Sequence, residues 1–128
     1  MITLSLLKYL ENNGFGKIDE KLFFQKLALD RKGIYITNIG DAQSRGMRRS
    51  QSYELYSRGK TDVDGYKQLD AVIKFLNGSY GVCKLPAVPP VTDKGFENVT
   101  IMPLSTISSV GLDDNDRMIY SATGTINY

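Results

Sequence analysis

The side chains best suited to chemistry are few in this sequence, and the commonest catalytic pairs cannot be built from them. Histidine is absent, and Cys83 is the only cysteine. Ser-His and Cys-His nucleophile pairs, the usual zinc ligand sets and an intramolecular disulfide are therefore excluded. Ser-Lys or carboxylate chemistry is left without a supporting motif, and Cys83 is predicted to be a buried, inert thiol. We therefore expect a protein that is not an enzyme and has no cofactor.

Two acidic clusters have the oxygen-rich composition of a calcium site. The run Asp113-Asp114-Asn115-Asp116 is contiguous, whereas an EF-hand loop alternates its carboxylates and needs a glycine and a distal glutamate. We interpret the run as a tight turn, in which Asp and Asn are common residues. Asp62 and Asp64 are interpreted as the first turn of a helix capped by Thr61, where the helix dipole favours negative charge. No metal site is predicted.

Two further motifs carry positive charge. Gly59-Lys60-Thr61 resembles the end of a phosphate-binding loop, but Glu54 stands where that loop needs its first glycine. The other motif is a cluster of Arg45, Arg48 and Arg49, and arginine pairs with carboxylates or phosphates in bidentate fashion. No aromatic residue is interleaved with these arginines, which argues against a platform for stacking bases. A solvated hairpin tip, a protein contact and a nucleic-acid contact stay open as interpretations of the cluster.

The elements that must position these residues follow from the apolar spacing. Helices are predicted over residues 3–13 and 62–76, and strands over residues 33–37, 50–57, 80–85 and 118–128. Residues 98–104 and 105–110 are expected to be extended, residues 111–116 to form a turn, and residues 16–29 fit either a helical turn or an extended segment. The polar stretch 40–49 would be the long tip of a hairpin.

The predicted order is helix, two strands, helix and three strands. This order predicts an α+β fold, in which two main helices flank a mixed, mostly antiparallel sheet that includes the long hairpin. The chain has 128 residues, 41% of them hydrophobic, which fits one domain over residues 1–128. The formal net charge of +2 is too small to indicate nucleic-acid binding by itself. Neither a membrane span nor a signal peptide is predicted, so we expect a cytoplasmic protein or one assembled there.

The layout and two of its phrases resemble a known family. The layout consists of the short amphipathic N-terminal helix, the hairpin with its polar tip, the second helix and the terminal strands. The phrases are residues 50–59, SQSYELYSRG, and residues 80–87, YGVCKLPA. Together they are similar to the tail terminator, or tail-completion, proteins of long-tailed bacteriophages, some of which are described as minor capsid proteins.

The resemblance implies a structural protein of the virion. It implies a homo-oligomeric ring, with six subunits expected, at the head-proximal end of the tail, assembled in the host cytoplasm. Such a ring caps the tail tube, stops its polymerisation and joins a head-completion or stopper protein, while DNA passes through the lumen without sequence-specific binding. Arg45, Arg48 and Arg49 are our candidates for contacts between subunits or with the lumen. The alternatives are another head–tail connector or tail-tube subunit, and a small nucleic-acid-binding module.

Overall fold

The computed structural model describes residues 2–25, 32–78, 82–89, 91, 94–112 and 116–128. Its two helices are α1 (Ile2–Asn12) and α2 (Asp62–Asn77). Its strands are β1 (Leu22–Phe24), β2 (Gly33–Arg45), β3 (Arg48–Arg58), β4 (Val82–Leu85), β5 (Phe96–Ile101), β6 (Ser108–Leu112) and β7 (Met118–Asn127). The predicted α+β class is confirmed.

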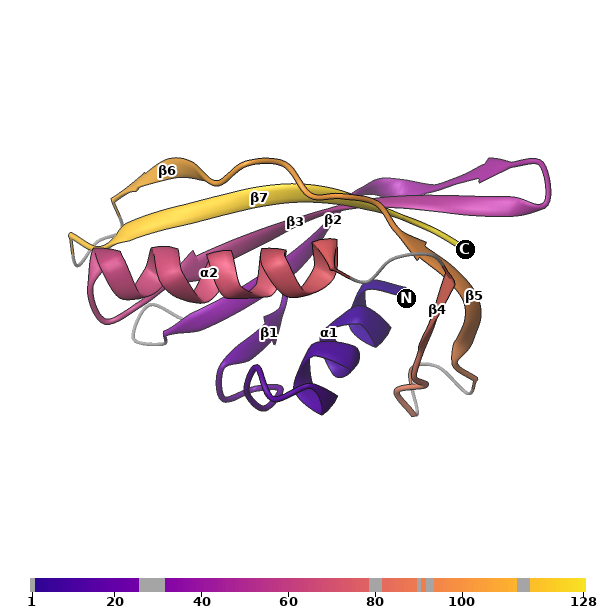
Figure 1. The fold of residues 1–128 in the computed structure, drawn as a ribbon, viewed down its shortest axis with the longest axis horizontal. Helices are drawn as coiled ribbons and strands as arrows, with labels where there is room; N and C mark the ends of the chain where they lie inside the picture. The colour runs from indigo at the N-terminus through magenta and orange to yellow at the C-terminus, as the bar shows by residue number, and fades with distance from the viewer. Residues whose placement is uncertain (1, 26–31, 79–81, 90, 92–93, 113–115) are drawn as a thin grey trace.

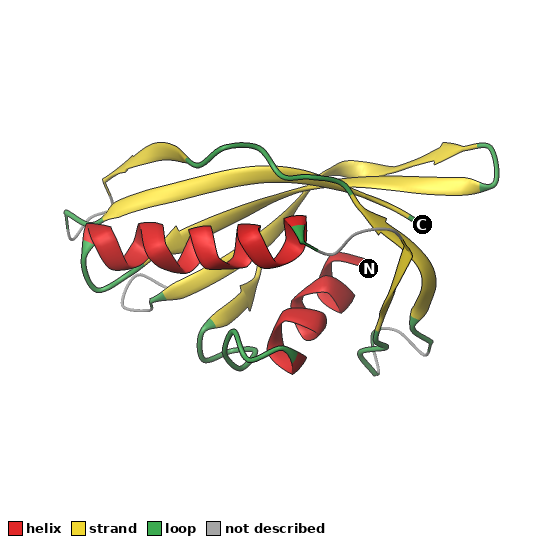
Figure 2. Ribbon diagram, in the orientation of Figure 1, coloured by secondary structure: helices red, strands yellow, loops and turns green. Residues whose placement is uncertain are grey.

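The strands form one mixed sheet, with both helices on the same face (Figures 1 and 2). The order across the sheet is β1-β2-β3-β7-β5-β4, and only the β1–β2 pair is parallel. Strand β7 is long enough to pair with β6 near its start and with β5 at its end. The predicted mostly antiparallel sheet flanked by two helices is therefore confirmed.

Strand β3 lies at the centre of the sheet and determines which face is buried. Tyr53 and Leu55 are fully buried beneath the helices, whereas their neighbours Glu54 and Tyr56 point to the other face. The register places further small or apolar residues beside them on the buried face: Ile36 and Ala122 flank Leu55, and Gly124 is opposite Tyr53. The core is therefore a single layer between this face and the two helices.

Each helix buries one apolar stripe in that layer. Helix α1 buries Leu6, Leu7 and Leu10 completely, as the helical spacing of its leucines predicts. Helix α2 begins at the predicted cap, where the Thr61 hydroxyl accepts a hydrogen bond from Asp64 N at 3.1 Å. Its buried residues are Gly65, Leu69, Val72, Ile73 and Leu76.

Helix α2 is held to the sheet by close backbone packing and by a short polar network. Gly65 lies so close to Gly59 that a Cβ on Gly59 would be 2.4 Å from Gly65 N. The buried Ser57 hydroxyl donates to Gly65 O at 2.7 Å and accepts from Gln68 Nε2 at 2.7 Å. Gln68 also donates to the Arg58 carbonyl at 3.1 Å. These contacts fix the start of α2 over the end of β3.

The structure corrects three details of the predicted elements. Residues 40–49 are not a long polar tip, because β2 and β3 continue as paired strands to a turn at Gly46-Met47. Residues 16–29, left ambiguous, include the short strand β1 (Leu22–Phe24). Four strands follow α2 rather than three, since both extended segments before β7 are paired. In each case backbone pairing forms a strand where the apolar pattern is short or absent.

We predict that Gly124→Ala destabilises the protein by roughly 1–3 kcal/mol. A Cβ on Gly124 would be 2.6 Å from the Tyr53 hydroxyl, and Tyr53 is fully buried and cannot move away. The Tyr53 hydroxyl has no hydrogen-bond partner in the described part of the chain, so Tyr53→Phe should raise the free energy of unfolding by about 1 kcal/mol. Urea unfolding measures both changes, and the double variant should recover part of the loss. A Gly124→Ala variant as stable as the parent would contradict this packing.

Candidate functional site

The face of the sheet opposite the helices is open, and its centre is polar with an aromatic pair. The rings of Tyr35 and Tyr56 stack with centroids 4.6 Å apart and an interplanar angle of 11°. The Tyr56 hydroxyl donates to the Glu54 carboxylate, and this bond, together with burial, raises the pKa of Tyr56 to about 12. Both tyrosines therefore stay neutral at physiological pH and offer a flat, half-buried surface.

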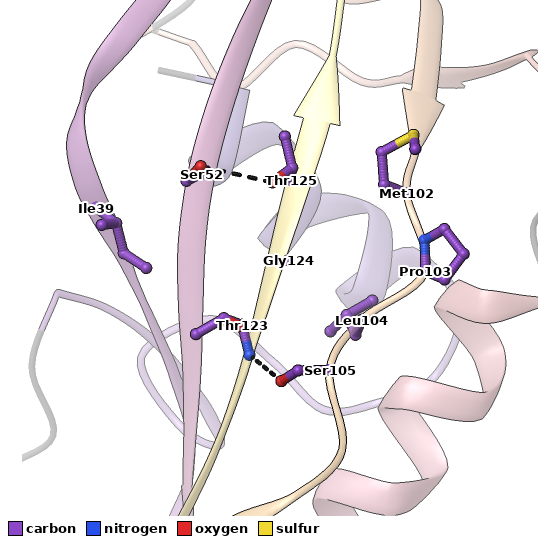
Figure 3. Close-up of a pocket in the computed structure, with 9 residues that line it drawn as sticks. All are labelled: Ile39, Ser52, Met102, Pro103, Leu104, Ser105, Thr123, Gly124 and Thr125. Carbon is purple, nitrogen blue, oxygen red and sulfur yellow. Dashed lines mark hydrogen bonds between the residues drawn. The ribbon is translucent and has the colours of Figure 1, made fainter.

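A groove of about 500 Å³ crosses this open face where β2, β3 and β7 run beside the segment after β5 (Figure 3). Ile39 and Met102 lie on its two sides and are 47% and 41% exposed. The Ser105 hydroxyl accepts from Thr123 N at 2.9 Å, which holds the segment after β5 against β7. The lining residues are Ile39, Ser52, Met102, Pro103, Leu104, Ser105, Thr123, Gly124 and Thr125.

The composition of the groove favours contact over catalysis. None of its lining residues has an ionisable side chain, so the groove itself provides no general acid, base or charged nucleophile. It combines apolar side chains with Ser and Thr hydroxyls, which can donate and accept hydrogen bonds, so it can bind another molecule by contact alone. The alternation of Thr123 and Thr125 with buried neighbours in β7 was the available sequence signal for this face, whereas nothing in the sequence indicated Met102 and Pro103 beside it.

Beyond the groove lies the end of the β2–β3 hairpin, which we call the arm and define as residues 40–49. Its last pair, Arg45 and Arg48, and the turn between them lie past the end of β7 (Figure 1). The arm begins at a bulge between Ile39 and Gln43, where Gly40 has a φ of +67°. The buried Gln51 side chain donates to the Gly40 carbonyl at 3.2 Å and so braces this bulge. At the tip, the Met47 side chain is fully exposed.

The structure places the three predicted arginines in the arm, and the contacts of Arg48 differ from those of Arg49. Arg48 Nη2 donates to the carbonyls of Asn98 and Asn127 at 3.0 and 3.1 Å, and contacts Thr100 Oγ1 at 3.3 Å. Arg48 therefore reaches across the end of β7 to β5 on the open face.

The guanidinium of Arg49 lies 5.8 Å from the centre of the Tyr128 ring, and Arg49 and Tyr128 also exchange backbone hydrogen bonds. Arg49 follows Arg48 directly in an extended strand, so the two side chains leave from opposite faces of the sheet. Arg45 occupies the register position opposite Arg48. The three arginines therefore cluster at the tip of the arm, where Arg45 and Arg48 flank the turn, and Arg48 and Arg49 anchor that end to β5 and β7.

The acidic clusters give no sign of a metal site in the part of the chain that is described. Asp62 Oδ1 accepts from Met118 N at 3.0 Å, so this carboxylate ties the start of α2 to β7. Asp113, Asp114 and Asn115 lie outside the described residues, while Asp116 has the positive φ of 57° that suits a turn. Among the described residues, no group of three or more His, Cys, Asp or Glu side chains is positioned to hold a metal ion.

Comparison with known proteins finds no matching family model and no matching curated protein. Of the helices in the described ranges, neither is long and apolar enough to cross a bilayer.

The thiol of Cys83 should react slowly with alkylating reagents at pH 8. Cys83 is half-buried, and burial raises the pKa of its thiol, so a smaller fraction is thiolate than in a free peptide. We expect a rate several-fold below that of an unstructured cysteine peptide, rising as the pH passes 9. Iodoacetamide labelling followed by mass spectrometry measures it, with the urea-unfolded chain as control. Equal rates for the folded and unfolded chains would contradict the prediction.

Removal of the Gln51 side chain should loosen the arm more than the rest of the sheet. Gln51→Ala leaves the Gly40 carbonyl without its donor, and we expect a loss of about 1–2 kcal/mol of stability. Amide exchange should accelerate within residues 40–48 and stay slow near Leu55. Gln43→Ala is the matched control, because the Gln43 side chain is exposed and its one bond, to Asp41 O, is 3.4 Å long. Uniform acceleration in both variants would contradict the bracing role.

Proposed function

We propose that this chain is a tail terminator of a long-tailed bacteriophage. It acts as a non-enzymatic structural subunit of a homo-oligomeric ring, for which we propose six copies. The ring caps the tail tube at its head-proximal end, stops polymerisation of the tube and binds the head-completion or stopper protein. It assembles in the host cytoplasm, becomes part of the virion, and lets DNA pass through its lumen.

The observation that carries this proposal is the one-sided build of the subunit. Both helices cover one face of the sheet, while the other face keeps a groove without ionisable groups and continues into the braced arm (Figures 1 and 3). An arm that projects beyond its own sheet adds little burial within the subunit. Met47 at its tip is fully exposed, so a partner can reach its side chain.

Ring closure requires two different surfaces on each subunit. In a head-to-tail ring, one patch of a subunit contacts a second patch of its neighbour, and rotation by a fixed angle closes the assembly. The arm and the opposite end of the sheet are separated along β3, which has 11 residues and therefore spans about 36 Å. Two such distant surfaces meet the requirement, whereas a two-fold dimer uses a single self-complementary patch.

The charge distribution suits a channel for DNA. The chain carries 16 basic and 14 acidic residues, and a stronger positive charge would bind the phosphate backbone and slow its passage. On the open face, the charged groups described above are Glu54 near the middle and Arg48 beside the turn of the arm. Sequence-specific readout would need several side chains that reach base edges together, and this face does not provide them.

The arm gives the most direct test of this proposal. Met47→Glu places a charge on a fully exposed side chain, so the free energy of unfolding should change by less than about 0.5 kcal/mol. We expect the variant to lose its place on the tube, which would leave tails of uncontrolled length and few joined heads. Electron microscopy of particles assembled with each variant measures tail length and head attachment.

Val91→Glu is the matched control, because Val91 is also exposed, at 52%, and does not belong to the arm. Normal tails with Met47→Glu would contradict a role for the arm in assembly. Normal tails in the complete absence of the chain would contradict the tail-terminator function itself.

A further inference from the structure

The charge of Arg48, next to the turn of the arm, is held in place without a carboxylate partner among the described residues. Arg48 is exposed, and its Nη2 contacts only neutral oxygens: two backbone carbonyls and the Thr100 hydroxyl. No ion pair joins Arg48 to a carboxylate among the described residues. Its recorded bonds use a single nitrogen, whereas a guanidinium presents five donors in a planar fork. Arg48 is therefore a positioned cation with donors left over for an outside acceptor.

The opposite end of the subunit carries carboxylates that form no ion pair with a described residue. Asp64 lies in the first turn of α2, and Asp116 immediately precedes Arg117 at the start of β7. Both residues are exposed, and neither carboxylate has a hydrogen bond or ion pair to a described residue. The bond from Met118 N to Asp62 Oδ1 holds the start of α2 beside the start of β7, so Asp64 and Asp116 belong to the same end.

The distance between the two ends makes pairing within one subunit impossible. Arg48 begins β3 and Arg58 ends it, and Gly59, the next residue, packs against Gly65 at the start of α2. Eleven strand residues span about 36 Å, several times the reach of an arginine side chain. Arg48 can therefore meet Asp64 or Asp116 only in another copy of the chain, in a head-to-tail contact.

We propose that Arg48 binds a carboxylate at the far end of a second copy of this chain, Asp64 or Asp116. This inference rests on the proposed ring and names the contact that closes it. A carboxylate fits the arginine fork in bidentate fashion, and the bonds of Nη2 to β5 and β7 hold the fork ready before the partner arrives. A protein carboxylate is favoured over phosphate because one positioned arginine, on a face that also carries the acidic Glu54, does not make a basic track.

Charge reversal tests the contact directly. Sedimentation velocity of the full chain, at increasing concentrations up to about 1 mM and at low salt, measures self-association. We expect Arg48→Glu to weaken self-association at least tenfold. Combining it with Asp64→Lys or with Asp116→Lys should restore most of the loss in one of the two double variants. Asp41→Lys is the control, because Asp41 lies on the arm itself and should not rescue.

A structural role for Arg48 is separated from the partner role by two measurements. Thr100→Val removes one of the Nη2 contacts and keeps the guanidinium, so it should leave self-association within about threefold of the parent. Amide exchange across residues 40–49 of Arg48→Glu shows whether the arm is still formed. If Arg48→Glu loses the arm, the milder Arg48→Gln takes the place of that variant. The charge-swapped double variants remain decisive, because rescue requires the new residues at positions 48 and 64 or 116 to attract each other.

Each remaining outcome decides the inference. A parent chain that does not self-associate, unchanged association of Arg48→Glu, or rescue by neither aspartate would overturn it. Loss of binding to duplex DNA in Arg48→Glu with self-association unchanged would overturn it in favour of phosphate. Rings that form independently of Arg48 and still cap tubes would leave the proposed function standing without this contact. Association through Arg48 in a chain that fails to cap tubes would refute the function and keep the contact.

Discussion

The burial of one face of β3 is the constraint on which the rest of the molecule depends. Tyr53 and Leu55 are fully buried at the centre of a single core layer. The strand register then determines which residues of β2 and β7 lie beside them on the buried face. Because side chains alternate along a strand, the same register commits the intervening residues to the opposite face. Gly124, opposite Tyr53, provides the space that the tyrosine ring needs. A slip of one residue would exchange the two faces and lose the core.

The open face and the arm follow from this one-sided core. The two helices cover only the face of the sheet on which Tyr53 and Leu55 lie. The other face therefore stays open and carries hydroxyl groups, the stacked tyrosine pair and the groove. The arm extends past the area that the helices can cover, and its stability comes from local braces instead of burial in the core. Gln51 supports the bulge at the base of the arm, while Arg48, beside the turn, links the arm to β5 and β7. A projecting element that is braced in this way can dock with less ordering of the chain than a flexible loop would need.

The sequence was informative where burial repeats with a regular period, and uninformative where backbone pairing acts without it. The helix cap at Thr61, the buried stripes of both helices and the alternation in β7 were all predictable from spacing. Residues 40–49 lack apolar alternation because neither side is in the core, so the pairing that makes them a strand left no pattern to detect. The arginines were identified as candidates, but the contacts of Arg48 join residues up to 79 positions apart in the chain. The groove could not be predicted, because Met102 and Pro103 meet β7 only through the tertiary fold.

A subunit with one packed face, one open face and a braced arm is suited to bury further surface by joining others, and the proposed ring is one such assembly. The most direct test is cryo-electron microscopy of tails or virions that contain this chain. The account predicts a single ring of subunits at the head-proximal end, between tube and connector, with each arm against the far end of the next subunit. Density repeated along the tube would identify a tube subunit instead, and no density in the particle would contradict a structural role in the virion.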